Sequence, residues 1–165
     1  AVEAQGRHRY FRLAGSDVAR LLESLMGVAF RTGAVRLVTG PREPALRKAR
    51  VCYDHLAGEL GVLAYDGLIA RGWLVDHAGS LFLTNAGADG FAAFGIDPAL
   101  AARERRTFCR PCLDWSERRH HLGGALGTAL LERLYALRWA RRAADSRVVV
   151  FTPRGEQQWR AAFAA

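Results

Sequence analysis

The sequence predicts an α+β fold that is mainly helical, with one amphipathic helix ahead of two tandem repeats. Apolar residues recur at helical spacing over about 14 residues near the N-terminus. From residue 45 onward, one pattern of helices, glycines and short apolar strands occurs twice. The 165 residues are 50% hydrophobic and 24% charged, a composition that excludes a disordered chain and suffices for a buried core.

Residues 1–30 form the first expected part. Basic and apolar side chains alternate over residues 7–13, which predicts a strand. Ser16 is the expected N-cap of the helix that follows, with Asp17 in its first turn. This helix could pack inside its own domain. Because no domain stands before it in the sequence, we expect its apolar stripe to contact a second copy of the chain, through Val18, Leu21, Leu22, Leu25 and Met26.

Residues 31–44 contain two glycines and two prolines and are expected to be a linker. Two repeats follow, residues 45–97 and 98–165. Residues 56–61 (LAGELG) match residues 122–127 (LGGALG), and Trp73 matches Trp139 at the same offset. Thr84 and Thr152 match at an offset two residues longer, and Pro153 after Thr152 is typical of a helix start.

Each repeat is expected to have the same order of elements. A short helix and a glycine-bearing turn precede a longer helix, then two strands, then a threonine-capped helix. The expected ranges are 62–71, 73–76, 81–83 and 85–94 in the first repeat, and 128–137, 139–142, 147–151 and 153–163 in the second. Helix, turn, helix and hairpin in this order are typical of a winged helix, so the sequence predicts two winged-helix-like repeats.

Four segments carry a resemblance to a known family. They are residues 5–13 (QGRHRYFRL), 17–23 (DVARLLE), 52–61 (CYDHLAGELG) and 110–122 (RPCLDWSERRHHL). The chain resembles the ArsR-type (arsenic-repressor) family of winged helix-turn-helix regulators, including the C-terminal extension of a longer subgroup. The resemblance implies that residues 1–30 are a wing strand and a dimerisation helix. It also implies that the family's recognition helix lies before Ala1, so that specific DNA binding belongs to the full-length parent protein.

The cysteines leave three hypotheses open. Cys52 and His55, and Cys109 and Cys112, have the spacing of zinc ligands, so zinc is a possible cofactor although none is expected. Alternatively, the thiols are small buried hydrophobes, or one is a low-pKa sensor stabilised by neighbours such as Arg118. Because Cys52 and Cys112 open the two repeats at matching places, we expect them to lie apart and favour the buried structural role. If the repeats instead pack face to face, the two thiols would lie within disulfide reach and could be oxidised or bind a soft metal.

Two aspartates follow these cysteines by two residues each. Asp54 and Asp114 could bind a ligand or anchor an arginine, but a helix cap or a buried aspartate bonded to backbone amides is the favoured interpretation. Trp115 and the nearby arginines could line an apolar effector pocket between the repeats. The full set of candidates for effector or thiol sensing is Cys52, Asp54, His55, Cys112, Asp114, Trp115, Arg118 and His121.

The chain carries a net charge of +8, and Lys48 is its only lysine. The arginines could contact phosphate, or could reflect a GC-rich genome. The hairpin of the second repeat is strongly basic, which is typical of a wing that binds DNA but also of a solvated turn. The candidates for DNA contact are Arg7, Arg9, Arg138, Arg141, Arg142 and Arg147. The helices ahead of the two hairpins carry few side chains that could read bases.

The sequence contains no nucleophile elbow, phosphate loop or zinc-protease motif, so no enzyme is expected. We expect the regulatory and oligomerisation region of a bacterial DNA-binding repressor that senses an unknown small effector. The expected partners are a second copy of the chain and, for the parent protein, DNA, but no membrane; three irregularly spaced cysteines favour the cytoplasm. The alternatives are a standalone nucleic-acid binder that uses the second hairpin, and a small zinc- or thiol-dependent enzyme.

Overall fold

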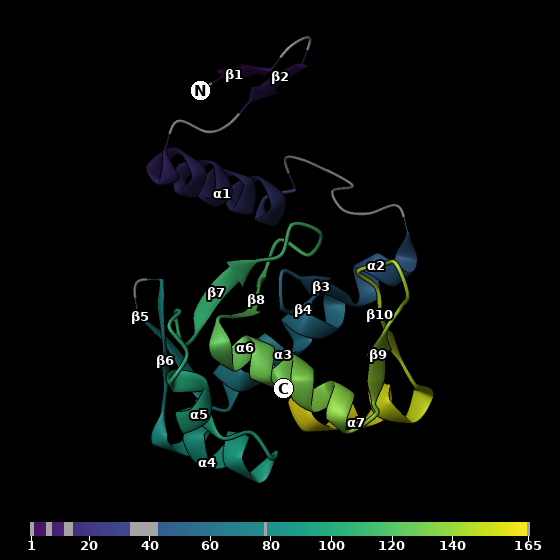
Figure 1. The fold of residues 1–165 in the computed structure, drawn as a ribbon. Coiled ribbons are helices and arrows are strands. Elements are labelled where there is room, and N and C mark those ends of the chain that lie inside the picture. Colours follow the sequence, from purple (N-terminus) through teal and green to yellow (C-terminus); the bar gives the residue numbers. More distant parts are fainter. Residues whose placement is uncertain (1, 6–7, 12–14, 34–42, 78, 165) are drawn as a thin grey trace. The chain divides into compact units, whose positions relative to one another are not determined.

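The computed structural model describes residues 2–5, 8–11, 15–33, 43–77 and 79–164, which belong to two compact units, Ala1–Val38 and Thr39–Ala165. In the first unit, β1 (Val2–Gln5) pairs antiparallel with β2 (His8–Phe11), and α1 (Ser16–Arg31) follows (Figure 1). The expected strand is therefore half of a hairpin, and the expected amphipathic helix is confirmed. Most of the expected linker lies outside the described residues.

The second unit begins with α2 (Pro44–Lys48), the hairpin β3 (Arg50–Cys52) and β4 (His55–Ala57), and α3 (Glu59–Ala70). The hairpin β5 (Leu74–His77) and β6 (Ser80–Leu83) and the helix α4 (Asn85–Ala93) complete its first half. The second half has the same order of elements: α5 (Pro98–Ala102), β7 (Arg110–Leu113), β8 (His120–Gly123), α6 (Ala125–Ala136), β9 (Ala140–Arg142), β10 (Val149–Phe151) and α7 (Pro153–Phe163). That the two halves superpose stays a prediction.

The hairpins β3–β4 and β7–β8 correct the expected helix-turn-helix order. In each half a hairpin stands between the short helix and the long helix, where a glycine-bearing turn was expected. Strands of three or four residues are too short to show a two-residue period in the sequence. The glycine that ends each hairpin, Gly58 or Gly124, has a φ of 88° or 86°, a conformation that favours glycine at the step from strand to helix.

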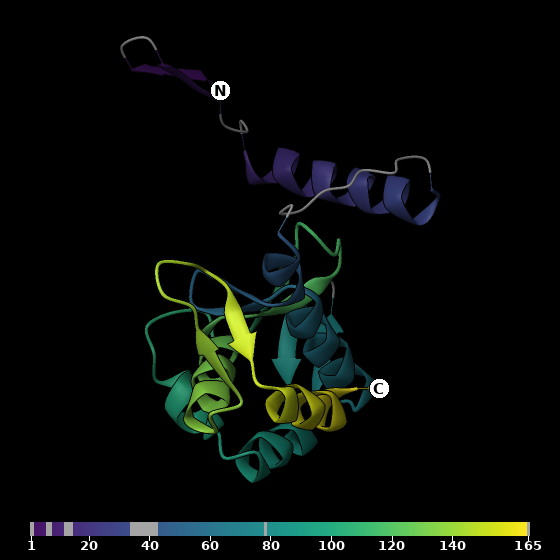
Figure 2. The ribbon, with the colours of Figure 1, turned by 90° about the vertical axis from the view of Figure 1, so that its right-hand side faces the viewer.

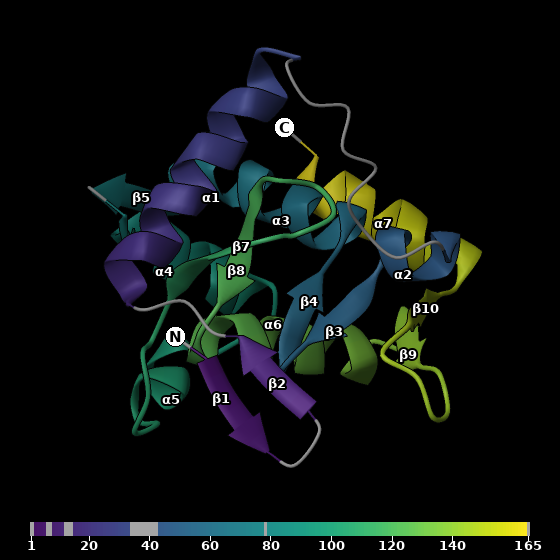
Figure 3. The same ribbon diagram turned by 90° about the horizontal axis from the view of Figure 1, so that it is seen from above.

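The two halves pack reciprocally. Helix α3 of the first half contacts β8 of the second, α6 of the second half contacts β4 of the first, and β4 lies beside β8 (Figure 3). Gly61 and Gly127 let each long helix lie close to the hairpin of its own half, and Gly127 also lies close to His55 of the other half. A Cβ atom on Gly127 would lie 2.4 Å from the Leu122 carbonyl oxygen and 3.2 Å from Cβ of His55. On Gly61 it would lie 2.6 Å from the Leu56 oxygen and 3.6 Å from Cβ of His121.

Both halves also contribute to one apolar core. Trp159 on α7 is fully buried, and its indole Nε1 donates a hydrogen bond to the backbone oxygen of Leu60 on α3. Helices α7 and α3 pack against each other (Figure 2). The expected threonine caps are confirmed, because Thr84 and Thr152 accept hydrogen bonds from the backbone amides of residues 87 and 155. No helix among the described residues has the length and apolar character that crossing a membrane requires.

Candidate functional site

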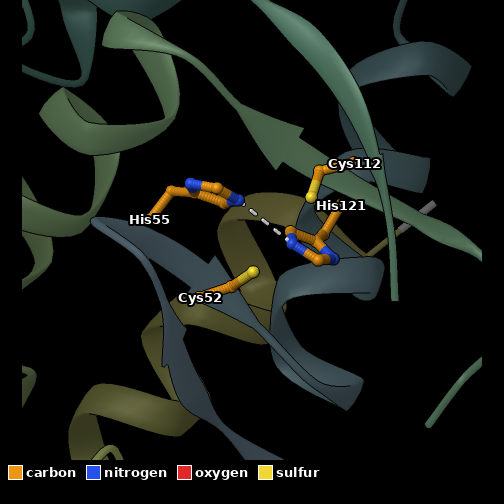
Figure 4. A group of neighbouring side chains, drawn as sticks. All are labelled: Cys52, His55, Cys112 and His121. Atoms are coloured by element: carbon orange, nitrogen blue, oxygen red, sulfur yellow. Dashed lines mark hydrogen bonds between the residues drawn. The ribbon is translucent and has the colours of Figure 1, made fainter. Parts of the chain in front are cut away.

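Four metal-ligand side chains meet between the two reciprocal hairpins. Cys52 ends β3, His55 begins β4, and Cys112 and His121 face each other across β7 and β8. One ligand atom from each residue lies within 4.8 Å of the corresponding atoms of the other three (Figure 4). The two histidines are buried, and the two cysteines are half-buried.

The two imidazoles of this Cys/His cluster face each other through Nε2, at 3.2 Å. An aspartate lies beside the outer nitrogen, Nδ1, of each imidazole. Nδ1 of His55 lies 3.0 Å from Oδ1 of Asp54, and Nδ1 of His121 lies 3.3 Å from Oδ2 of Asp114. A carboxylate beside Nδ1 favours the proton on that nitrogen and leaves the lone pair on Nε2. This applies to His55, whereas Nδ1 of His121 has only the charge contact with Asp114 and no hydrogen bond among the described residues.

Asp114 is fully buried at the centre of a polar network. It accepts hydrogen bonds from Arg50 Nη2 at 2.7 Å, from the Gly58 amide at 2.7 Å and from the Ser116 amide at 2.9 Å. Burial opposes ionisation, but contacts with His121 and these donors hold the pKa of Asp114 well below its usual range. The favoured interpretation of Asp114 as a buried, amide-bonded aspartate agrees with this geometry.

Asp54 lies at the surface in the two-residue turn of β3–β4 and forms an ion pair with Arg106. The two aspartates therefore have parallel arrangements. Each holds a histidine of its own hairpin and pairs with an arginine from the other half of the unit, Arg106 for Asp54 and Arg50 for Asp114. Arg50 compensates the buried charge of Asp114, whereas Arg106 pairs with both Asp54 and Glu104.

The thiols are electrostatically coupled to the imidazoles. Hydrogen bonds from Cys112, His121 and His55 lower the pKa of Cys52, and the proximity of the Cys52 sulfur raises the pKa of Cys112. Burial would lower the pKa of His121, but its contacts with Asp114 and Cys52 raise it. A thiolate beside two carboxylate-held imidazoles can coordinate a cation, and the paired sulfurs can also be oxidised.

Comparison with known proteins places this site in a regulator. Over 156 residues, 94% of this chain and 69% of the relative, the chain is 41% identical to a protein of Bacillus subtilis (strain 168) described as the uncharacterized HTH-type transcriptional regulator YdfF. The chain belongs to this family of HTH-type transcriptional regulators. No family model matches the chain, and no solved structure matches it significantly.

The prediction that Cys52 and Cys112 lie apart is wrong. The reciprocal packing of the halves brings their hairpins together, so equivalent positions meet instead of lying apart. Cys109 is not part of the Cys/His cluster: it is buried and its thiol donates to the backbone oxygen of Leu81. The fourth member is His121, which the zinc hypothesis omitted.

The arginines that were candidates for DNA contact lie outside the Cys/His cluster. Arg138, Arg141, Arg142 and Arg147 are exposed around the β9–β10 hairpin. A surface depression of about 640 Å³ lies at this turn, lined by Arg142 and Arg147 among others. Arg9 lies on β2, and Arg7 is outside the described residues.

The remaining candidates of the HTH-type regulator lie in the β7–β8 loop. Trp115 is 42% exposed, and the Arg50 guanidinium lies 5.0 Å from its ring centroid, so Trp115 covers the buried arginine. Arg118 lies in the same loop, with a φ of 56°. Arg50, Arg106 and Gly58 also belong to the polar network around the cluster, and no motif in the sequence pointed to them. The offset of 66 residues that separates His55 from His121 is the one signal that relates the two histidines.

Proposed function

We propose that the chain is the regulatory and oligomerisation portion of an ArsR-type repressor that binds DNA as a homodimer. In this proposal β1–β2 is the wing of a winged helix, with Arg7 and Arg9 beside the DNA backbone, and α1 is the dimerisation helix. Residues 45–165 sense an effector at the Cys/His cluster. The membership in a family of HTH-type regulators supports DNA binding.

The observation that carries the sensing role is the position of the Cys/His cluster. It joins two hairpins from different halves, and Asp114 connects it to the Gly58 amide at the start of α3. An effector that binds or oxidises the cluster would change how the halves pack. Regulation requires such a difference between two states, because a ligand shifts an equilibrium only through unequal affinity for them.

We expect cluster variants to change the operator affinity of the complete regulator. Operator fragments would be selected from genomic DNA, and binding would then be measured with the wild type, Cys52→Ser and Cys112→Ser. Allosteric coupling of typical size changes affinity by about 5- to 150-fold. Cys109→Ser is the matched control, because this buried thiol lies outside the cluster. Equal operator affinity for all four proteins, with and without thiol oxidant or metal, would contradict the sensing role.

The apolar face of α1 supports a dimer with a second copy of the chain. Leu21, Leu22, Leu25 and Val28 are 59%, 42%, 56% and 48% exposed. Exposed leucines at helical spacing favour burial against an equivalent helix. Each leucine buried in an interface contributes roughly 1.5–3 kcal/mol.

The double substitution Leu21→Glu with Leu25→Glu is expected to raise the dimer dissociation constant by at least ~100-fold. Multi-angle light scattering across a concentration series would report the loss of the dimer. Arg20→Glu places a charge change on the opposite face of α1 and is expected to leave the dimer intact. A wild-type chain that is monomeric at micromolar concentration would refute the proposed role of α1.

A further inference from the structure

We infer that Cys52, His55, Cys112 and His121 bind one zinc-class divalent ion in a tetrahedral Cys2His2 site. The role of the ion in regulation rests on the proposed function. The metal site itself follows from the positions of the four side chains. Each half of the unit supplies one sulfur and one nitrogen. The ion would thus crosslink the two hairpins.

The distances fit this coordination. Two nitrogen ligands of a tetrahedral zinc ion, each about 2.0–2.1 Å from the metal, lie roughly 3.3 Å apart, and two sulfur ligands lie ~3.8 Å apart. The two Nε2 atoms of His55 and His121 are 3.2 Å apart, and all four ligand atoms lie within 4.8 Å of one another. Only small side-chain movements would close the shell.

Carboxylates lie beside the outer nitrogens of both imidazoles. Asp54 forms a hydrogen bond with Nδ1 of His55, and Oδ2 of Asp114 lies 3.3 Å from Nδ1 of His121, while the two Nε2 atoms face each other inside the cluster. Metal-bound histidines typically have such a carboxylate on the outer nitrogen. Two buried imidazoles with carboxylates beside their outer nitrogens therefore favour a ligand role over core packing.

The donor set selects the class of ion. Two thiolates and two neutral imidazoles compensate the charge of a divalent ion, and they prefer zinc and related thiophilic metals over magnesium or calcium. Asp114 is paired with Arg50, and Arg106 pairs with both Asp54 and Glu104.

The test uses the reduced, chelator-stripped chain. Zn²⁺ titration against a chromophoric chelator is expected to give one tight site per chain. Co²⁺ is expected to give the visible ligand-field bands of a tetrahedral site together with a thiolate charge-transfer band. Cys112→Ser and His121→Gln should abolish stoichiometric binding, whereas Cys109→Ser and His120→Gln should retain it. His120 is an exposed neighbour of His121 on the same strand.

The Asp54→Asn variant tests the metal site with a substitution that should not disturb the fold. Asp54 lies at the surface, so its substitution should leave the fold intact. It is expected to weaken zinc binding by about 10- to 100-fold, as other outer-shell changes do. Circular dichroism would verify the fold of every variant. An unchanged zinc affinity for a folded Asp54→Asn protein would count against the orienting role.

Several results would overturn the inference. They are the absence of a stoichiometric site in the reduced chain, a Co²⁺ complex without a thiolate band, and equal binding by the Cys112→Ser and Cys109→Ser proteins. Disulfide formation between Cys52 and Cys112 without any metal binding would also overturn it. Zinc binding that leaves operator affinity unchanged would support the metal site while contradicting the proposed sensing function, so the two can fail separately.

Discussion

Replacing Asp114 by alanine is expected to lower the free energy of unfolding by about 3–5 kcal/mol. The carboxylate is 0% exposed and forms an ion pair at 2.7 Å with Arg50, which is 1% exposed. Without Asp114, the guanidinium stays buried with no opposite charge, and the Gly58 amide loses its acceptor. Urea unfolding of the metal-free chain would measure the loss, because the absence of metal separates this effect from any change in zinc binding.

Two further variants test the cause of this loss. Asp66→Ala removes a partly exposed carboxylate that pairs with Arg119 at 2.5 Å, and surface pairs contribute only about 0–1 kcal/mol. The double variant Asp114→Leu with Arg50→Met removes both buried charges and should recover much of the stability. An Asp114→Ala protein that unfolds at the same urea concentration as Asp66→Ala would contradict the central role of this pair.

Trp159→Ala is the second large loss that we expect, at roughly 3–5 kcal/mol. The indole is 0% exposed, its ring centroid lies 4.5 Å from that of Phe163, and its Nε1 bonds to Leu60 at 3.0 Å. Alanine would leave a cavity between α7 and α3. Thermal and urea unfolding, analysed with a two-state model, would report the change.

Two further variants show what causes the loss of stability in Trp159→Ala. Trp159→Phe keeps most of the ring volume but loses the hydrogen bond, so it should cost clearly less than alanine. Trp115→Ala, at a position that is 42% exposed, should cost about 1 kcal/mol or less. If Trp159→Ala were no more destabilising than Trp115→Ala, α7 would not be an integral part of the shared core.

Local patterns in the sequence were sufficient for much of the fold. The apolar stripe predicted α1 because a helix of 16 residues displays its period over several turns. Thr84 and Thr152 marked the starts of α4 and α7, since a cap depends on a side chain and an amide three residues away. The hairpins β5–β6 and β9–β10 were expected within a few residues of their observed positions.

The hairpins that hold the Cys/His cluster were not predictable in this way. Strands β3 and β4 have three residues each, and their side chains are buried on both faces, so no alternation is visible. The sequence did place the cysteines and histidines at related positions, with His55 and His121 one repeat offset apart. It did not say whether related positions lie near each other.

The sequence by itself therefore determined the helices, the caps, the outer hairpins and three of the four residues of the Cys/His cluster as possible zinc ligands. Only the tertiary structure decided that Cys52, His55, Cys112 and His121 form one site and that Cys109 does not. The physical reason is that the cluster depends on contacts between segments more than 50 residues apart, with β4 packed against α6 and β8 against α3. Such packing is set by the shapes of two surfaces, which no local pattern records.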